Sequence, residues 1–340
     1  MIFEYWKTKL NSKQRQFYDD LYSSFSAGRD STVIRGLSNE EIQRAYAYFK
    51  CDHPEMFFIS NAPMLARRLF SEISFVSKSI YPSGELIKRK SAMAEAVNEI
   101  KSRLPYNADE CQKEFAVTEY IVDRVQYSID NAKNQDASSV LYSGAAQCSG
   151  IACAVKYLLD NLNVRCITVM GEIRTDRAAG PHSWNIVYIG GVPYHLDVTS
   201  IIGSNRRGEK PYLFNHFNLS DRQLTTHAWD RVNVPVCENS FSPPDSIKSN
   251  PEANISLTAS AYENSGSALI ISSLYEFRRK FMDELDKPHN EFKFISKIKC
   301  DSDNELMQII SAACRQCFTQ KKISYAVRIN ISAGLVTLIW

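Results

Sequence analysis

A pair of adjacent glycines, Gly190 and Gly191, sets the strongest constraint on how this chain folds. They separate two short runs with the composition of β-strands, HSWNIVYI at 182–189 and VPYHLDVT at 192–199. A two-residue Gly-Gly connection is typical of a tight β-hairpin, because both turn positions need backbone angles that glycine adopts without strain. The turn also predicts the register. Ile189 faces Val192, and each step back along the first strand is matched by one step forward along the second.

This register places a histidine and an aspartate on one face of the hairpin. His182 lies opposite Thr199 and Trp184 lies opposite Asp197, and residues two apart on a strand point to the same side. His182 and Asp197 are therefore diagonal neighbours, about 7–8 Å apart at the backbone, which an imidazole and a carboxylate can span. His195 shares that face and is a rival for the histidine. The alternatives are a histidine that is only structural and an aspartate that only caps a turn.

A cysteine at the start of a predicted helix is the candidate nucleophile. A loop around residues 143–144 precedes the apolar sequence AAQCSGIACAVKYLLDN, and Cys148 lies in or near the first turn of that helix. Unpaired backbone N–H groups and the helix dipole favour a thiolate there and could hold a developing oxyanion. A neighbouring His182 would accept the thiol proton, and Asp197 would fix the tautomer of the ring. The other interpretation is that Cys148 is a small buried core residue.

The same residues carry a resemblance to a known family. The stretches GAAQCSGIACAVKYLLDNLNVRCITVMGE and GPHSWNIVYIGGVPYHLDVTS resemble the transglutaminase-like superfamily in its bacterial form. Those proteins have a cysteine in a glycine-bracketed turn that opens a helix, then a His-x-Trp-Asn strand and a Tyr-His-x-Asp-x-Thr strand. The segments 50–60, 111–128 and 214–229 are also similar, so that the resemblance covers roughly residues 50–240.

The resemblance implies both a fold and a set of site residues. It implies an α+β fold, the papain-like transglutaminase core, in which the cysteine helix packs on an antiparallel sheet. It also implies that Cys148 is the nucleophile, His182 its base and Asp197 the partner of that base. His195 is then left with a role in packing or in supporting the site.

Three further residues are candidates for contact with a substrate. Gln147, directly before Cys148, is either a donor to an oxyanion or a surface residue of the helix. Trp184 shares a face with His182 and is interpreted as a wall of the site and as a core aromatic residue, two roles that are compatible. Tyr142 either lines the cleft or is an ordinary packed tyrosine.

The 340 residues are enough for two or three domains. We predict an N-terminal α/β segment at 1–105, a catalytic core at 106–240 and a C-terminal α/β unit at 268–340. The stretch 241–267 is rich in Ser, Asn and Pro and is interpreted as a linker. Outside the core, the patterns predict strands at 56–60 and 73–81, and a helix, strand, helix and hairpin at 268–286, 291–299, 303–319 and 323–339.

Charge, hydropathy and cysteine content narrow the expected partners. The net charge of +2 gives no reason to expect nucleic acid. No run approaches the ~18 apolar residues of a membrane span, and the first residues lack a secretory signal, so we expect no membrane insertion and a cytoplasmic location, with export by a non-classical route left open. Nine cysteines, an odd number, are expected to be free thiols. We expect no metal or cofactor, interpret Cys314 and Cys317 as packed helix cysteines, and leave the oligomeric state open.

These features together predict thiol-dependent acyl chemistry on an amide bond of a protein or peptide. Cys148 would attack a carbonyl, and water or an amine would resolve the thioester. Hydrolysis, deamidation of glutamine and crosslinking share the same catalytic residues, and we place peptidase or amidase activity ahead because water always competes as acceptor. The alternatives are a catalytically silent binding module that keeps the fold, and a scaffold whose C-terminal unit recruits a partner.

Overall fold

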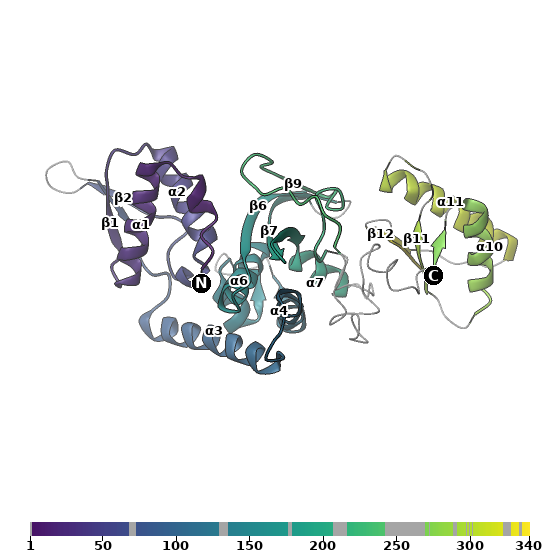
Figure 1. The fold of residues 1–340 in the computed structure, drawn as a ribbon, viewed down its shortest axis with the longest axis horizontal. Coiled ribbons are helices and arrows are strands. Elements are labelled where there is room, and N and C mark those ends of the chain that lie inside the picture. The colour runs from purple at the N-terminus through teal and green to yellow at the C-terminus, as the bar shows by residue number, and fades with distance from the viewer. Residues whose placement is uncertain are drawn as a thin grey trace.

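The computed structural model describes residues 2–67, 73–128, 135–175, 179–206, 216–241, 269–271, 273–287, 291–296, 298, 300, 302–321, 328–332 and 335–340. Figure 1 shows an N-terminal unit, a central unit and a C-terminal unit in chain order. Each unit has its own hydrophobic core, and each contains both helices and strands, so the predicted α+β class is confirmed. Among these residues, no helix combines the length and the apolar character needed to cross a membrane.

The N-terminal unit packs two helices on a small antiparallel sheet. Its elements are η1 (Trp6–Lys9), α1 (Ser12–Ser26), β1 (Ser31–Ile34), α2 (Asn39–Asp52), η2 (Pro54–Met56), β2 (Met64–Arg67) and β3 (Ile73–Val76). β3 lies between the other two strands. Capping boxes at Asn11 and Ser38 begin α1 and α2, because each side chain accepts a hydrogen bond from an otherwise unpaired N–H of the first turn. The predicted strand at 56–60 is wrong, since Pro54 starts a 3-10 turn there and Ile59 makes an isolated bridge instead.

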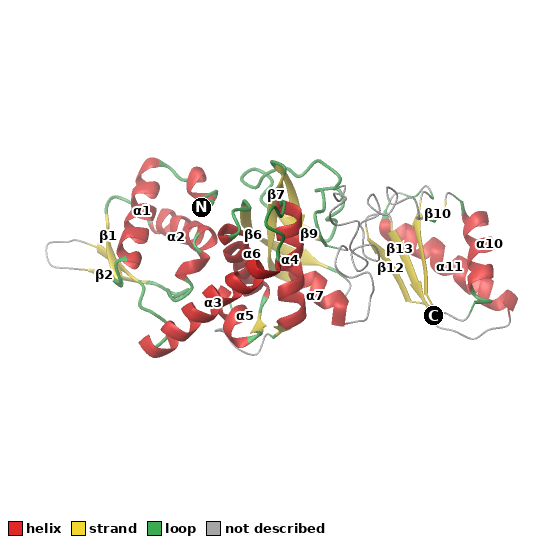
Figure 2. Cartoon of the chain, turned by 60° about the horizontal axis from the view of Figure 1, so that its bottom comes forward, coloured by secondary structure: helices red, strands yellow, loops and turns green. Residues whose placement is uncertain are grey.

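The central unit covers a four-stranded antiparallel sheet with helices (Figure 2). Its helices are α3 (Ser83–Arg103), α4 (Glu110–Arg124), α5 (Ala137–Ser143), α6 (Cys148–Asn161) and α7 (Val198–Arg206). Its sheet has the order β8-β7-β6-β9, formed by β6 (Cys166–Arg174), β7 (Ala179–Ile189), β8 (Val192–Leu196) and β9 (His227–Trp229). A short parallel pair, β4 (Gln126–Tyr127) with β5 (Ala145–Ala146), leads the chain into α6.

Helix α6 is the element around which the central core is built. It packs against α4, α5, β6 and β7, and its stripe of aliphatic side chains is buried. Gly144 ends α5 in the left-handed region, at φ 66°, which side chains other than glycine rarely adopt. The chain then pairs β5 with β4 and enters α6 with Gln147 as the N-cap. The turn at Gly144 and the pairing of β5 with β4 therefore hold the backbone that leads into α6. Cys148, in the first turn of α6, is half-buried.

The hairpin predicted from the two glycines is confirmed. Gly190 and Gly191 have φ of 59° and 84°, and Ile189 pairs with Val192. The second strand is shorter than predicted, because it ends at Leu196 rather than at residue 199. The reason is that Asp197 begins α7, where its Oδ1 accepts the backbone N–H of Ser200 at 3.1 Å.

The N-terminal segment is tied to the central unit by buried hydrogen bonds. The indole N–H of Trp6 donates to the carbonyl of Thr168 on β6 at 2.8 Å. The ammonium of Lys156 on α6 donates to the carbonyl of Phe3 at 3.1 Å and pairs with Asp160 at 2.8 Å. These contacts bring α2 close to β6, and the two elements pack against each other.

The C-terminal unit is a four-stranded sheet with two helices. Its elements are β10 (Ile270–Ile271), α10 (Leu274–Glu284), β11 (Glu291–Ser296), α11 (Asp303–Lys321), β12 (Arg328–Ser332) and β13 (Leu335–Ile339), and the strand order is β10-β11-β13-β12. Cys314 and Cys317 of α11 lie in its core, as interpreted from the sequence. The predicted linker at 241–267 lies outside the described residues, apart from Phe241.

Candidate active site

Three side chains that are far apart in the sequence meet at the start of α6. Cys148 is the first residue of α6, His182 lies on β7, and Asp197 follows β8. Nε2 of His182 lies 2.9 Å from Oδ2 of Asp197, so the predicted contact between them is present. His182 also acts on the thiol of Cys148, whose pKa it lowers. Since the carboxylate engages Nε2, the ring nitrogen that remains for the sulfur is Nδ1.

The surroundings of Cys148 favour its thiolate. Burial alone would raise the pKa of this thiol, but four effects outweigh it and bring the pKa below the ordinary value of 9.0. They are the hydrogen bond to His182, the charge of that ring, and hydrogen bonds from the backbone N–H groups of Ser183 and Ser149. Ser149 is the second residue of α6, where backbone donors have no partner within the helix.

The charges of His182 and Asp197 support each other. Burial works against a charged imidazole, but the charge and hydrogen bond of Asp197, followed by those of Cys148, raise the pKa of His182 to about 10. Burial would likewise raise the pKa of Asp197, and the two histidines beside it, His182 and His227, lower it well below the ordinary value. The lowered thiol pKa and the raised imidazole pKa both favour a thiolate next to an imidazolium that a carboxylate holds in place.

Asp197 has more partners than the hairpin register predicts. Its Oδ2 accepts the hydroxyl of Ser200 at 2.5 Å and Nε2 of His227 at 3.0 Å, in addition to His182. The carboxylate therefore caps α7 and orients an imidazole at the same time, so both interpretations drawn from the sequence hold. The sequence analysis missed His227. This residue reaches Asp197 through the pairing of β9 with β6, and no local pattern in the sequence predicts that pairing.

Trp184 packs against the imidazole ring of His182. Its ring stacks on the imidazole with the centroids 6.0 Å apart and the planes 19° apart. The indole is 1% exposed, so the packing favours the core interpretation, and its contact with a substrate stays a prediction. Gly171 on β6 makes room for this ring, since a Cβ there would lie 2.8 Å from the indole and 2.3 Å from the carbonyl oxygen of Ala228.

His195, the rival histidine, belongs to a separate buried network. Its Nδ1 accepts the indole N–H of Trp184 at 3.0 Å, and its Nε2 lies 2.9 Å from Oδ1 of Asp221. Burial lowers the pKa of His195 to about 4, against the opposing effect of Asp221. His195 is therefore neutral at pH 7. It shares the face of His182, as the register predicts, but Trp184 lies between them.

The two other predicted substrate contacts have different surroundings. Gln147 is half-buried at the N-cap of α6, and its Oε1 accepts a hydrogen bond from the side chain of Gln135 at 3.3 Å. Tyr142 is 43% exposed at the end of α5, where the guanidinium of Arg89 lies 4.8 Å from its ring centroid. Contact of either residue with a substrate stays a prediction.

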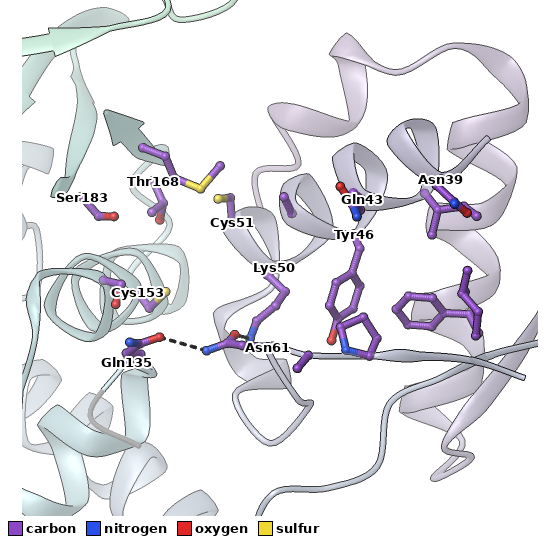
Figure 3. Close-up of a pocket in the computed structure, with 18 residues that line it drawn as sticks. Asn39, Gln43, Tyr46, Lys50, Cys51, Asn61, Gln135, Cys153, Thr168 and Ser183 are labelled. Atoms are coloured by element: carbon purple, nitrogen blue, oxygen red, sulfur yellow. Dashed lines mark hydrogen bonds between the residues drawn. The ribbon is translucent and has the colours of Figure 1, made fainter. Parts of the chain in front are cut away.

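A cavity of about 740 Å³ opens beside the reactive pair, between the N-terminal and central units (Figure 3). Ser149 and Ser183, whose backbone N–H groups face the sulfur of Cys148, are among the residues that line it. The facing wall comes from α2 and from the segment that leads into β2. A substrate that fills this cavity would therefore contact the residues that directly follow Cys148 and His182 in the chain.

Two clusters of metal-ligating side chains are present in the described part of the chain, His182 with Asp197 and His227, and His195 with Asp221 and Cys237. In both clusters the carboxylate already accepts hydrogen bonds from its neighbours, which accounts for the close approach of the donor atoms. Burial also raises the pKa of Cys237 far above the range in which a thiolate ligand forms.

Comparisons with known proteins agree with this geometry. Residues 95–198 match the sequence profile of the Transglutaminase-like superfamily, a segment that ends one residue after Asp197. Solved structures with similarity to the chain include a proposed cysteine protease from Cytophaga hutchinsonii (13% identity, TM-score 0.28, 41% of this chain and 61% of that chain) and a TGase (13%, 0.29, 50% and 50%). A proposed protease from Parabacteroides distasonis ATCC 8503 is a third (14%, 0.25, 41% and 30%). The chain thus spans less than two thirds of each of these structures, and no curated protein matches it.

Proposed function

We propose that this chain, whose residues 95–198 match the model of the Transglutaminase-like superfamily, is a cysteine-dependent enzyme that cleaves carboxamide bonds of a peptide or protein. One observation carries the proposal: His182, which contacts Asp197 at 2.9 Å, lowers the pKa of Cys148 at the N-terminus of a buried helix. A lowered thiol pKa and a raised imidazole pKa at the same point favour a charged pair that is ready to react.

The mechanism follows from the position of each group. The thiolate of Cys148 attacks the carbonyl carbon, a C–S bond forms, and the carbonyl oxygen becomes an oxyanion beside the backbone N–H groups of the first turn. His182 donates its proton to the leaving nitrogen as the C–N bond breaks, and a thioester remains. Water then attacks the thioester while His182 takes its proton, and the carboxylic acid leaves as the thiol is restored. Asp197 keeps the ring oriented and stabilises its positive charge.

Water is the acceptor that we favour. A transferase must exclude water from the thioester and must admit an amine instead, whereas a hydrolase needs only an open site. Deamidation of glutamine is the same hydrolysis with ammonia as the leaving group. Crosslinking would use a lysine amine in place of water and every other step unchanged.

Selective alkylation of the folded protein tests whether Cys148 is the activated thiol. We expect limiting iodoacetamide below pH 7 to label Cys148 first, as mapped by mass spectrometry. Cys153 is the internal control, because it lies on the same helix and burial raises the pKa of its thiol to about 11. Hydrolysis of glutamine-containing and isopeptide-linked peptides, followed as ammonia or amine release, then tests turnover. Labelling of Cys153 ahead of Cys148 would contradict the proposal.

A further inference from the structure

The cavity beside Cys148 has one charged group in an otherwise neutral lining. The described residues around it combine apolar side chains with hydroxyl, amide and thiol groups, and Lys50 of α2 is the charged one among them. Figure 3 shows the Lys50 side chain extending from α2 toward the side of the cavity where Cys153 and Gln135 lie. A volume of about 740 Å³, apolar walls and a single cation are typical of a pocket for a small ligand or a short peptide segment.

The ammonium of Lys50 has neutral partners in the described part of the chain. Nζ donates to the backbone carbonyl of Ile59 at 3.4 Å and to Oδ1 of Asn61. Asp136 is the carboxylate nearby, but Ser138, Ser139 and Tyr81 already occupy its two oxygens. Burial lowers the pKa of Lys50, against smaller opposing effects of Cys153, Asp136 and Cys51. A partly buried cation without a carboxylate partner is costly to keep, and an incoming anion would offset that cost.

A line of hydrogen bonds joins Lys50 to the residue before the nucleophile. Asn61, which accepts from Lys50, donates through Nδ2 to Oε1 of Gln135 at 3.1 Å. Gln135 donates in turn to Oε1 of Gln147 at 3.3 Å. Lys50 is thus linked to the N-terminus of α6, and the cavity that it lines is also lined by Ser149 and Ser183, the residues that follow Cys148 and His182 in the chain.

We propose that this cavity binds a carboxylate of the amide substrate, with the Lys50 ammonium as its counter-ion and the scissile carbonyl at Cys148. The inference rests on the proposed function, and it adds a substrate class: amides that carry a carboxylate, such as an acidic side chain or a free terminus, a few bonds from the reacting carbon. One compact ammonium with neutral neighbours suits a monoanionic carboxylate. A phosphate would call for a fork of several donors of the kind that arginine provides.

Paired affinity probes test this inference. Chloroacetamides of the form Cl–CH₂–CO–NH–(CH₂)n–COO⁻ are compared with their primary-amide counterparts. Linkers of about two to six methylenes cover spans on the order of one to two helical turns. The thiolate of Cys148 forms an S–C bond as chloride leaves, and intact mass spectrometry gives the rate. At one linker length we expect the acid to react at least about tenfold faster than the amide, because it gains a charge-assisted hydrogen bond.

Three variants assign the effect to Lys50. In Lys50→Met the ratio of acid to amide rates should fall to about one while the amide probe keeps its rate, which also reports that the fold is intact. Lys50→Arg should keep most of the ratio, because the positive charge remains. Lys90→Met, which removes an exposed cation on α3 outside the cavity lining, should leave the ratio unchanged.

The outcomes separate the two proposals. Equal rates for acid and amide probes at every linker length in the unmodified protein, with Cys148 reacting, would overturn the inference and leave the proposed function standing. A ratio that survives in Lys50→Met would also overturn the inference. Failure of Cys148 to react with any probe would overturn both.

Discussion

Substitution of Gly171 by alanine tests how the sheet holds the imidazole. A Cβ at this position would lie 2.3 Å from the carbonyl oxygen of Ala228 and 2.8 Å from the ring of Trp184. Overpacking usually costs about 1–3 kcal/mol. Here the nearest atom belongs to the backbone of β9, which cannot rotate away, so we expect a loss near the upper end, about 3 kcal/mol. At about 2–4 °C per kcal/mol for a unit of this size, the Tm should fall by roughly 6–12 °C.

The same substitution should slow the thiol chemistry. Trp184 stacks on His182 and also contacts His227, with ring centroids 4.8 Å apart, so a displaced indole moves the imidazole that faces the sulfur. Misplacement of a catalytic group by an ångström can cost up to a hundredfold in rate, and we expect Cys148 to be alkylated at least about tenfold more slowly in Gly171→Ala.

Gly84→Ala is the matched control. Gly84 lies in the first turn of α3, and a Cβ there would meet nothing within 4 Å. This change should stabilise the protein by about 0.4–1 kcal/mol through the unfolded chain and should leave alkylation unchanged. An unaltered Tm in Gly171→Ala would refute the packing argument. A lowered Tm with normal alkylation of Cys148 would refute the link between the sheet and His182.

Four further predictions concern Cys148, His182 and Asp197. Cys148→Ala should abolish peptide hydrolysis in an amine-release assay while melting close to the unmodified protein. His182→Ala should abolish hydrolysis as well and should lower the Tm, because the buried carboxylate of Asp197 then loses a charged partner. The double variant should be little less active than either single variant, because the residues act as a unit. Asp197→Asn should keep a small fraction of the activity and should also lower the Tm, since the same carboxylate caps α7; full activity would exclude an orienting role. In pH profiles of alkylation, Cys148 should stay reactive below the pH at which an ordinary cysteine is no longer a thiolate. His182→Ala should move the inflection of this profile to higher pH, because the effect of burial on the thiol pKa is then less opposed. The pKa of His182 is raised from 6.5 to about 10 in the folded protein, so its contribution to stability is complete below pH 6.5 and is lost as the pH rises through about 10. The pKa of Asp197 is lowered, so its contribution to stability is present above the ordinary pKa of 3.8 and is lost as the pH falls further. Thermal melts across pH check both directions.

Much of the site can be predicted from patterns within short stretches of the sequence. A two-residue turn of two glycines fixes which residues of β7 and β8 face each other, and the side-chain alternation of strands then brings His182 near Asp197. The apolar spacing of α6 and the turn before it likewise place Cys148 at a helix start. These features involve neighbours within about 20 residues, so short-range geometry is sufficient to predict them.

Only the tertiary structure decided what surrounds Cys148, His182 and Asp197. His227 reaches Asp197 because β9 pairs with β6. Trp184 is buried because Gly171 has no side chain, so that the indole and β9 both pack closely against it. Lys50 lines the same cavity as Ser149 because the N-terminal segment is tied to β6 and α6 through Trp6 and other buried contacts. Each of these depends on two segments that are far apart in the chain and meet by packing. Packing is decided by the shape and burial of the whole core, and no single stretch of sequence carries that information.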